Sequence, residues 1–159
     1  MKVSTKGRYG LRLMFDLAVH YEEGLLPLKE IARREEISSK YLEQIVMQLS
    51  RAGLVRSVRG SQGGYSLGRE PENITVGTVL RVLEGSLDPV DCVSDGTTPC
   101  SRADNCVTME VWRSIKDAVD EVVDGITLAD LIKRHQQKSD CGCGCECGCG
   151  SSSKKGRTV

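Results

Sequence analysis

The chain has 159 residues, 39% of them hydrophobic, and equal numbers of acidic and basic side chains, 22 of each. That length and composition fit one compact domain with appendages, or a small two-part regulator. The sequence has no apolar run of about 18 residues and no apolar segment at its start, so it predicts neither a transmembrane helix nor a secretory signal. We therefore expect a cytoplasmic protein, in which cysteines bind metals or react more often than they form disulfides.

The balanced net charge hides a difference between the two halves of the chain. Residues 1–69 carry 12 Lys and Arg against 7 Asp and Glu, whereas residues 70–159 carry 10 against 15. A basic front half is typical of a head that binds a polyanion, and an acidic back half of a part used for sensing or assembly. Nucleic acid is therefore a candidate partner.

The front half begins with a predicted helix over residues 4–23. Two short helices follow, over residues 28–35 and 38–52, and Ser38 is the expected N-cap of the second. Gly53 supplies the residue that ends it. Two short helices with a tight turn between them and a polar start to the second form the helix-turn-helix pattern.

A β-hairpin is predicted directly after these helices. Residues 54–58 alternate as a strand, a Gly-rich turn follows, and residues 65–67 return. A hairpin in this position is a wing, and it carries Arg56 and Arg59. An arginine at a hairpin tip suits the narrow, negatively charged minor groove of DNA. The order of these elements predicts a winged DNA-binding domain over residues 1–84.

The back half contains a cysteine loop followed by a long amphipathic helix. The loop spans residues 85–106 and is rich in Gly, Pro, Asp and Thr. The long helix has an apolar stripe of roughly twenty residues that the first domain does not need, which predicts a dimerisation helix. This helix and a last short one occupy residues 107–135. Residues 136–159 have the composition of a disordered tail rich in Cys and Gly.

Taken together, these features resemble the Rrf-two family of winged-helix transcription factors, and most of all its IscR-like members. The resemblance covers roughly residues 1–135 and excludes the tail. It is carried by the cysteine loop before a Trp-bearing helix and by the segments STKGRYGLRLMFDLA, ISSKYLEQIVMQL and GLVRSVRGSQGGYSLG. It implies a mostly α fold, namely a winged helix-turn-helix with a small β-hairpin wing, plus a long dimerisation helix that crosses its partner's in a homodimer.

The resemblance also assigns contacts to double-stranded operator DNA, and the chemistry of the side chains agrees. The start of a recognition helix enters the major groove, where Gln44 suits adenine and Glu43 suits cytosine. Basic and hydroxyl side chains nearby suit phosphate contacts, which position the protein without specifying sequence. The candidate DNA-binding residues are Lys6, Arg8, Ser38, Ser39, Lys40, Tyr41, Glu43, Gln44, Arg56, Arg59, Gly60, Ser61 and Gln62.

Three thiols of the loop, Cys92, Cys100 and Cys106, lie where cluster-binding members of the family carry theirs. Thiolates suit iron–sulfur clusters and zinc, and a flexible loop allows three of them to converge. The resemblance implies an iron–sulfur cluster, with [2Fe-2S] favoured and [4Fe-4S] as the other form. Zinc and free redox-active thiols are the alternatives.

The fourth ligand is left open by the sequence. IscR-like members have a histidine three positions after the third cysteine, where this chain has Met109, and nitric-oxide-sensing members use an acid where this chain has Arg8. A small exogenous thiol or a water is one candidate. The candidates within the chain are Glu110, Thr108, Asp91, Asp104 or a tail cysteine such as Cys141.

Three functions remain in competition. The first is a regulator that senses cluster or redox status and, as the resemblance implies, controls genes of cluster assembly or cysteine metabolism. The second is a cluster-free repressor of cysteine metabolism, controlled by thiol oxidation or by a cysteine-biosynthesis or cluster-assembly protein. The third is a metal or cluster carrier that uses the segment CGCGCECGCG of the tail. An enzyme is not expected, because the sequence offers no nucleophile–base pair, phosphate loop or paired carboxylates.

Overall fold

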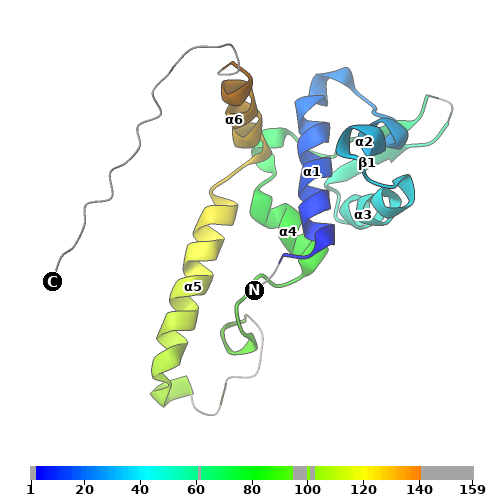
Figure 1. Ribbon diagram of the computed structural model, residues 1–159. Helices are drawn as coiled ribbons and strands as arrows, with labels where there is room; N and C mark the ends of the chain where they lie inside the picture. The colour runs from blue at the N-terminus through cyan, green and yellow to red at the C-terminus, as the bar shows by residue number, and fades with distance from the viewer. Residues whose placement is uncertain (1–2, 61, 95–99, 101–102, 141–159) are drawn as a thin grey trace.

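A computed structural model of the chain describes residues 3–60, 62–94, 100 and 103–140. They form a helical head from which one long helix extends (Figure 1). Apart from short 3₁₀ turns, the first elements along the chain are α1 (Thr5–Val19), α2 (Leu28–Glu35), α3 (Ser39–Arg51), β1 (Val55–Val58) and β2 (Gly64–Leu67). It continues with α4 (Val76–Glu84), α5 (Val107–Asp124) and α6 (Leu128–Asp140). This mostly α architecture, with a small two-stranded sheet in the place of the wing, confirms the predicted fold class.

Local sequence signals set the starts of α1 and α3. The hydroxyl of Ser4 accepts hydrogen bonds from the backbone N–H groups of Lys6 and Gly7. The hydroxyl of Ser38 accepts one from the backbone N–H of Tyr41. These bonds satisfy N–H groups that lack a partner in the first turn of a helix. The first helix ends at Val19, four residues before the predicted end, and a short 3₁₀ turn replaces its last part.

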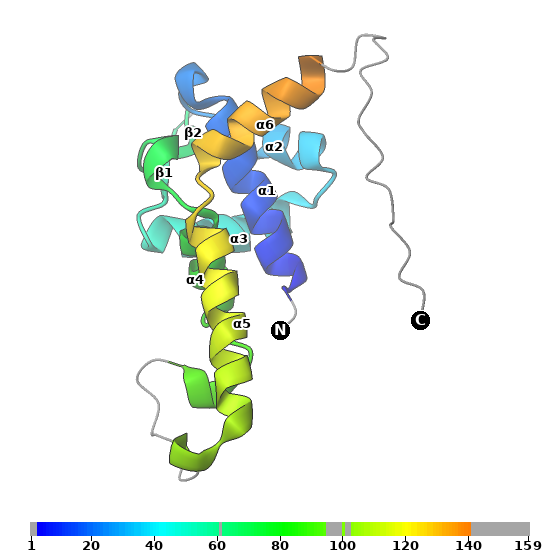
Figure 2. The same ribbon diagram turned by 90° about the vertical axis from the view of Figure 1, so that its left-hand side faces the viewer.

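α1 lies at the centre of the head, with α4 and α6 packed against it (Figure 1, Figure 2). Two glycines on α1 allow a close approach to α4. A Cβ added at Gly10 would lie 2.0 Å from a methyl of Leu83, and one at Gly7 would lie 2.2 Å from Glu84 Oε1. That carboxylate accepts the N–H of Gly7 at 2.9 Å, so α4 also caps the positive end of α1.

The wing is an antiparallel pair whose register runs from Val55 opposite Leu67 to Val58 opposite Gly64. Its second strand is tied to the head by two backbone hydrogen bonds between Leu26 and Tyr65, both 2.9 Å long. The second strand of the wing is therefore held beside the helix-turn-helix.

α6 continues to Asp140, five residues beyond the predicted boundary of the tail. The ring of His135 lies edge-on to that of Phe15 on α1, with 5.4 Å between the ring centroids. Gln136, Gln137 and Lys138 are good helix formers, so the helix continues past this contact. Residues 141–159, with the five tail cysteines, lie outside the described residues. No helix that the structure describes is long and apolar enough to cross a membrane.

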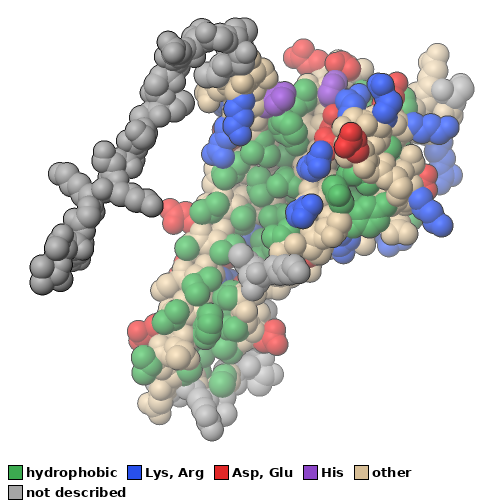
Figure 3. Space-filling view, in the orientation of Figure 1, with side chains coloured by type: hydrophobic (Ala, Val, Ile, Leu, Met, Phe, Trp, Pro, Cys, Tyr) green, Lys and Arg blue, Asp and Glu red, His purple; other side chains and the backbone are tan. Residues whose placement is uncertain are grey.

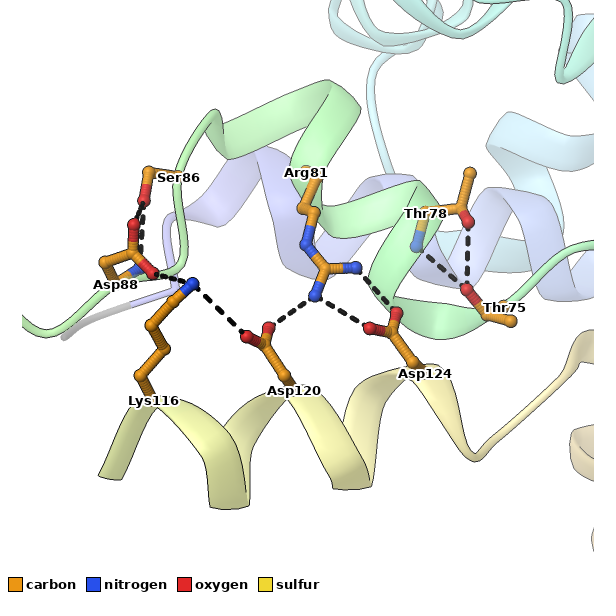
Figure 4. A network of polar contacts seen from close by, with 8 residues as sticks. All are labelled: Thr75, Thr78, Arg81, Ser86, Asp88, Lys116, Asp120 and Asp124. Carbon is orange, nitrogen blue, oxygen red and sulfur yellow. Dashed lines mark hydrogen bonds and ion pairs between the residues drawn. The ribbon is translucent and has the colours of Figure 1, made fainter. Parts of the chain in front are cut away.

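Charged side chains join α4 to α5 and to the loop between them (Figure 4). Arg81 on α4 bonds to Asp124 and Asp120 on α5, and Lys116 on α5 pairs with Asp88 in the loop. The hydrogen bonds from Arg81 lower the pKa of the Asp124 carboxyl, and the same hydrogen bonds raise the pKa of Arg81. A hydrogen bond from Ser86, followed by bonds from Ser94 and Lys116, lowers the pKa of Asp88.

These lowered pKa values predict an acid-sensitive junction. An aspartate with a folded pKa below its unfolded value of about 3.9 adds stability that is fully present above that value. This stability is lost as the pH falls through the folded pKa, because the unfolded state then binds more protons. We expect urea denaturation to show a steeper loss of stability below about pH 4 in the wild type than in Asp124→Asn. Parallel curves for the two proteins between pH 7 and 3 would contradict this.

Candidate nucleic-acid interface and cysteine loop

The outer face of α3 is free to meet a partner. Leu42, Ile45 and Leu49 are fully buried in the core, whereas the intervening Glu43 and Gln44 are exposed. The helical repeat of 3.6 residues places these two groups on opposite faces of α3. Two further candidate contacts at the start of the helix, Ser38 and Lys40, are also exposed, and Ser39 is half-buried.

A broad hollow of about 1050 Å³ lies between α3 and the wing. Ser39 and Glu43 line it from α3, and Arg59 and Gly60 line it from the wing. Tertiary structure thus brings residues of the predicted recognition helix and wing tip to one surface. Arg56, Arg59, Gly60 and Gln62 are exposed on the wing, whereas Ser61 lies outside the described residues.

Tyr41 has a packing role as well as a place on α3. Its half-buried ring lies edge-on to Tyr9 of α1, with 6.1 Å between the centroids. The guanidinium groups of Arg8 and Arg12 lie 5.7 and 5.9 Å from the centre of the Tyr9 ring. This cluster holds the start of α3 against α1, which orients the helix that carries Glu43 and Gln44.

The two basic candidates on α1 lie apart from the wing. Arg8 is exposed and lines a different hollow, of about 580 Å³, between α1 and α6. Leu11, Phe15 and Arg134 line that hollow too. Lys6 is half-buried near the start of α1. Neither residue lines the hollow between α3 and the wing, and neither do Lys40 and Gln44. The DNA contacts of all the candidate residues stay predictions.

An ion pair that sequence analysis missed joins α2 of the helix-turn-helix to α1, with a buried carboxylate and a partly exposed guanidinium. Asp16 is only 6% exposed, and Arg34 of α2 donates to both of its oxygens, at 2.9 and 2.7 Å. These hydrogen bonds raise the pKa of Arg34. The sequence gives no local signal for the pair, because its members lie on different helices.

The three loop thiols are reachable from solvent. Cys92 lies in a 3₁₀ turn and Cys106 is the residue before α5. Cys92 and Cys100 are exposed, and Cys106 is half-buried. Within the described parts of the chain, no three His, Cys, Asp or Glu side chains are close enough to hold a metal ion. Residues 95–99 and 101–102, which separate the thiols, lie outside those parts.

The candidate fourth ligands fall into three groups. Thr108 and Glu110 lie near Cys106: the Thr108 hydroxyl is 3.3 Å from the Cys106 sulfur, and Glu110 and Cys106 line one hollow of about 520 Å³. Asp91 lies in the same turn as Cys92. The side chain of Asp104 and the whole of Cys141 lie outside the described residues.

Met109, at the position where the resemblance places the histidine of IscR-like members, is only 4% exposed, so it packs into the protein interior. The donor set still suits a thiolate-bound group, because three thiols and an adjacent carboxylate belong to one loop and the helix that follows it.

Comparison with known proteins bears on both the interface and the loop. The family model Rrf2, described as an iron-dependent transcriptional regulator, matches residues 3–134. The HTH-type transcriptional regulator CymR of Bacillus subtilis is 50% identical over 131 residues, 82% of this chain and 89% of that protein. The HTH-type transcriptional regulator IscR of Aliivibrio salmonicida is 42% identical over 142 residues, 88% of this chain and 83% of that one.

Solved structures agree. The structure of CymR, the global cysteine regulator of B. subtilis, matches with a TM-score of 0.70 and 48% identity, over 84% of this chain and 98% of that one. The structure of T. potens IscR matches with a TM-score of 0.71 and 48% identity, over 87% of this chain and 90% of that one. Relatives of both kinds are DNA-binding regulators rather than enzymes. This chain therefore belongs to the Rrf2 family of transcriptional regulators.

Proposed function

We propose that the chain is a homodimeric regulator whose affinity for operator DNA depends on an iron–sulfur cluster held by the loop of residues 85–106. The observation that carries the proposal is the position of this loop. Three solvent-reachable thiols lie in the loop that precedes α5, and the C-terminal half of α5 is joined to the DNA-binding head by charged contacts. A change in the loop therefore has a physical route to the head.

The hollow that Glu43 and Arg59 line together supports contacts of α3 and the wing with one DNA duplex, and Gln44 lies outside its lining on the exposed surface of α3. Gln44 and Glu43 would meet base edges in the major groove, and Arg59 would enter the adjacent minor groove. Lys40 and Ser38 at the start of α3 would contact phosphate, where the positive end of the helix favours an anion. The target genes we propose, by similarity to relatives named IscR and CymR, belong to cluster assembly or cysteine metabolism.

The exposed face of α5 supports the homodimer. Val107, Val111, Ile115 and Val122 are 79, 55, 38 and 60% exposed, and they recur along one helix. Hydrophobic side chains gather along α5 and continue onto the head between α1 and α6 (Figure 3). Contiguous apolar surface of this kind marks a protein interface. We propose that a second copy of the chain covers this apolar face. Dimerisation then gives the protein two recognition helices, which suits a palindromic operator.

Cys92, Cys100 and Cys106 would hold the cluster, and [2Fe-2S] is the form we favour. The cluster supplies a group that oxidation or iron shortage can alter or remove. Glu110 and Thr108 are the proposed fourth ligands among the residues beside Cys106. An oxygen ligand in place of the histidine of IscR-like members would make the cluster labile, which suits a sensor of cluster supply.

A cluster-free regulator controlled by thiol oxidation is the second candidate. The buried Met109 favours it, because the histidine of the IscR-like pattern is replaced by a side chain packed in the interior. The 50% identity to CymR favours it too. In this alternative the exposed thiols of Cys92 and Cys100 would react directly, or a partner protein would control DNA binding.

Anaerobic purification of the full chain, with iron, sulfide and zinc assays and an absorption spectrum, tests the proposal. We expect a coloured protein with matching iron and sulfide, whose affinity for DNA changes when the cluster is removed. A colourless protein with stoichiometric zinc would contradict the cluster. A colourless, metal-free protein whose DNA binding responds to oxidation would favour the second candidate. A variant that ends at Asp140 separates metal bound by the loop from metal bound by the tail, the site of the carrier hypothesis.

A further inference from the structure

α5 is attached to the head at its C-terminal end, and its N-terminal half extends away from the head (Figure 1). The attachment is a pair of backbone hydrogen bonds, each 2.9 Å long. One runs from the N–H of Val76 to the carbonyl of Ile126, and the other from the N–H of Leu128 to the carbonyl of Ile74. Both bonds lie just past the end of α5. They hold the C-terminal end of α5 in place. The direction of the α5 axis relative to the head then depends on side chains farther along the helix.

Arg81 of α4 is the side chain that fixes this direction (Figure 4). One terminal nitrogen donates to Asp124 Oδ1 at 2.6 Å, and the other donates to Asp124 Oδ2 at 2.9 Å and also to Asp120. A two-point bond between a guanidinium and a carboxylate allows only a narrow range of angles. Asp120 and Asp124 lie about one helical turn apart. One arginine therefore holds two successive turns of α5, and we call these three residues the Arg81 clamp.

Gly77 leaves the space that the clamp needs. A Cβ added at Gly77 would lie 2.0 Å from Asp124 Oδ1 and 2.7 Å from a terminal nitrogen of Arg81. Gly77 is buried and its φ is not in the left-handed region, so alanine would suit the helix itself but not this contact. The glycine thus provides a second, charge-preserving way to disturb the clamp.

The apolar contacts at the same junction hold α4 and α5 together without fixing their angle. Val119 and Val123 of α5 pack against a small cluster that includes Leu80 and Leu87. Hydrophobic contact is non-directional, so these side chains tolerate a range of crossing angles. The directional side-chain bonds along α5 include those of the clamp and those of Lys116, which pairs with Asp120 at 3.6 Å and with Asp88 of the cysteine loop at 3.3 Å.

We propose that Arg81 is a positioning residue, whose clamp fixes the angle between the head and α5 and thereby the half-site spacing that the dimer accepts. The proposal rests on the homodimer proposed above. If the two heads are carried by paired α5 helices, a small rotation of each head on its α5 moves its recognition helix relative to the partner's. Helix-turn-helix dimers need their two recognition helices about 34–36 Å apart, one turn of DNA, so they are sensitive to this rotation.

The test measures affinity against half-site spacing. Wild-type full chain selects a palindromic duplex from random DNA, and that duplex is then lengthened or shortened by one and two base pairs at its centre. Fluorescence anisotropy gives the affinity for each duplex. We expect a one-base-pair change to weaken wild-type binding roughly five- to tenfold, within the usual range of coupling between sites. In Arg81→Met and Gly77→Ala, the same one-base-pair change should weaken binding less than about twofold. In Arg81→Lys the loss of affinity should lie between these values and that of the wild type.

Lys133→Met is the matched control, because it breaks an exposed pair between Lys133 and Asp130 within α6 and leaves the clamp intact. It should keep the wild-type profile. Thermal unfolding and light scattering establish that each variant is folded and dimeric. A dimeric wild type whose spacing profile Gly77→Ala and Arg81→Met leave unchanged would overturn the clamp alone. A dimeric wild type indifferent to spacing would also overturn the clamp alone, whereas a monomeric wild type would contradict the proposed homodimer as well.

Discussion

Replacing Arg59 with alanine is expected to lower the affinity for selected operator DNA at least tenfold, which is about 1.4 kcal/mol. Arg59 is exposed and lines the hollow between α3 and the wing, so its guanidinium can reach DNA that contacts α3. A guanidinium in a narrow minor groove interacts with the strong negative potential there. The loss should therefore be largest on operators with A·T base pairs beside each half-site. It should also reduce the slope of log affinity against log salt concentration by about 1.

Arg69→Ala is the matched control for this measurement. Arg69 is exposed and lies beyond β2, and it does not line the hollow between α3 and the wing. Its removal costs the same unit of charge and should change affinity less than about threefold. Equal losses for the two variants would show that the wing acts only through overall charge. An Arg59→Ala protein with wild-type affinity would contradict the proposed placement of the wing on DNA.

Replacing any one of Cys92, Cys100 and Cys106 with alanine is expected to remove most of the cluster. Loss of a thiolate leaves the iron with too few protein ligands, because the remaining candidates are weaker oxygen donors. Iron and sulfide per chain should fall several-fold, the visible absorption should disappear, and DNA affinity should no longer depend on anaerobic loading. The thermal unfolding of the metal-free proteins should match that of metal-free wild type, since Cys92 and Cys100 are exposed.

Cys149→Ala serves as the control, because it removes a thiol of the tail that none of the proposed loop contacts needs. It should retain the iron, the colour and the response of DNA binding. If this variant bleached and Cys92→Ala did not, the cluster would belong to the tail. Glu110→Gln and Thr108→Val separate the two proposed oxygen ligands. The variant that removes a real ligand should make the cluster decay faster in air.

The cysteine loop has one feature that the sequence predicts and one that depends on tertiary packing. The spacing of three thiols before a helix identifies a candidate metal site without any structure. The burial of Met109 was not visible in the sequence, because a methionine at the start of an amphipathic helix is compatible with both exposed and buried positions. Only packing decided that this side chain belongs to the interior.

By itself, the sequence determined the helices, the hairpin and the order that makes them a winged helix-turn-helix. Capping by Ser4, Ser38 and Thr75 and the apolar repeats act within a few residues, so they can be recognised along the chain. The extension of α6 to Asp140 was missed, because its last turns lack a strong apolar pattern.

Contacts between distant segments were decided by the tertiary structure. Arg81 lies 39 and 43 residues from its two aspartates, and Asp16 lies 18 residues from Arg34. Nothing in the local pattern of either arginine identifies its partner. The separation of Arg8 from the wing has the same origin, since α1 faces α4 and α6 as well as α3. Side-chain pairing across helices depends on how the helices pack, and that packing is a property of the whole fold.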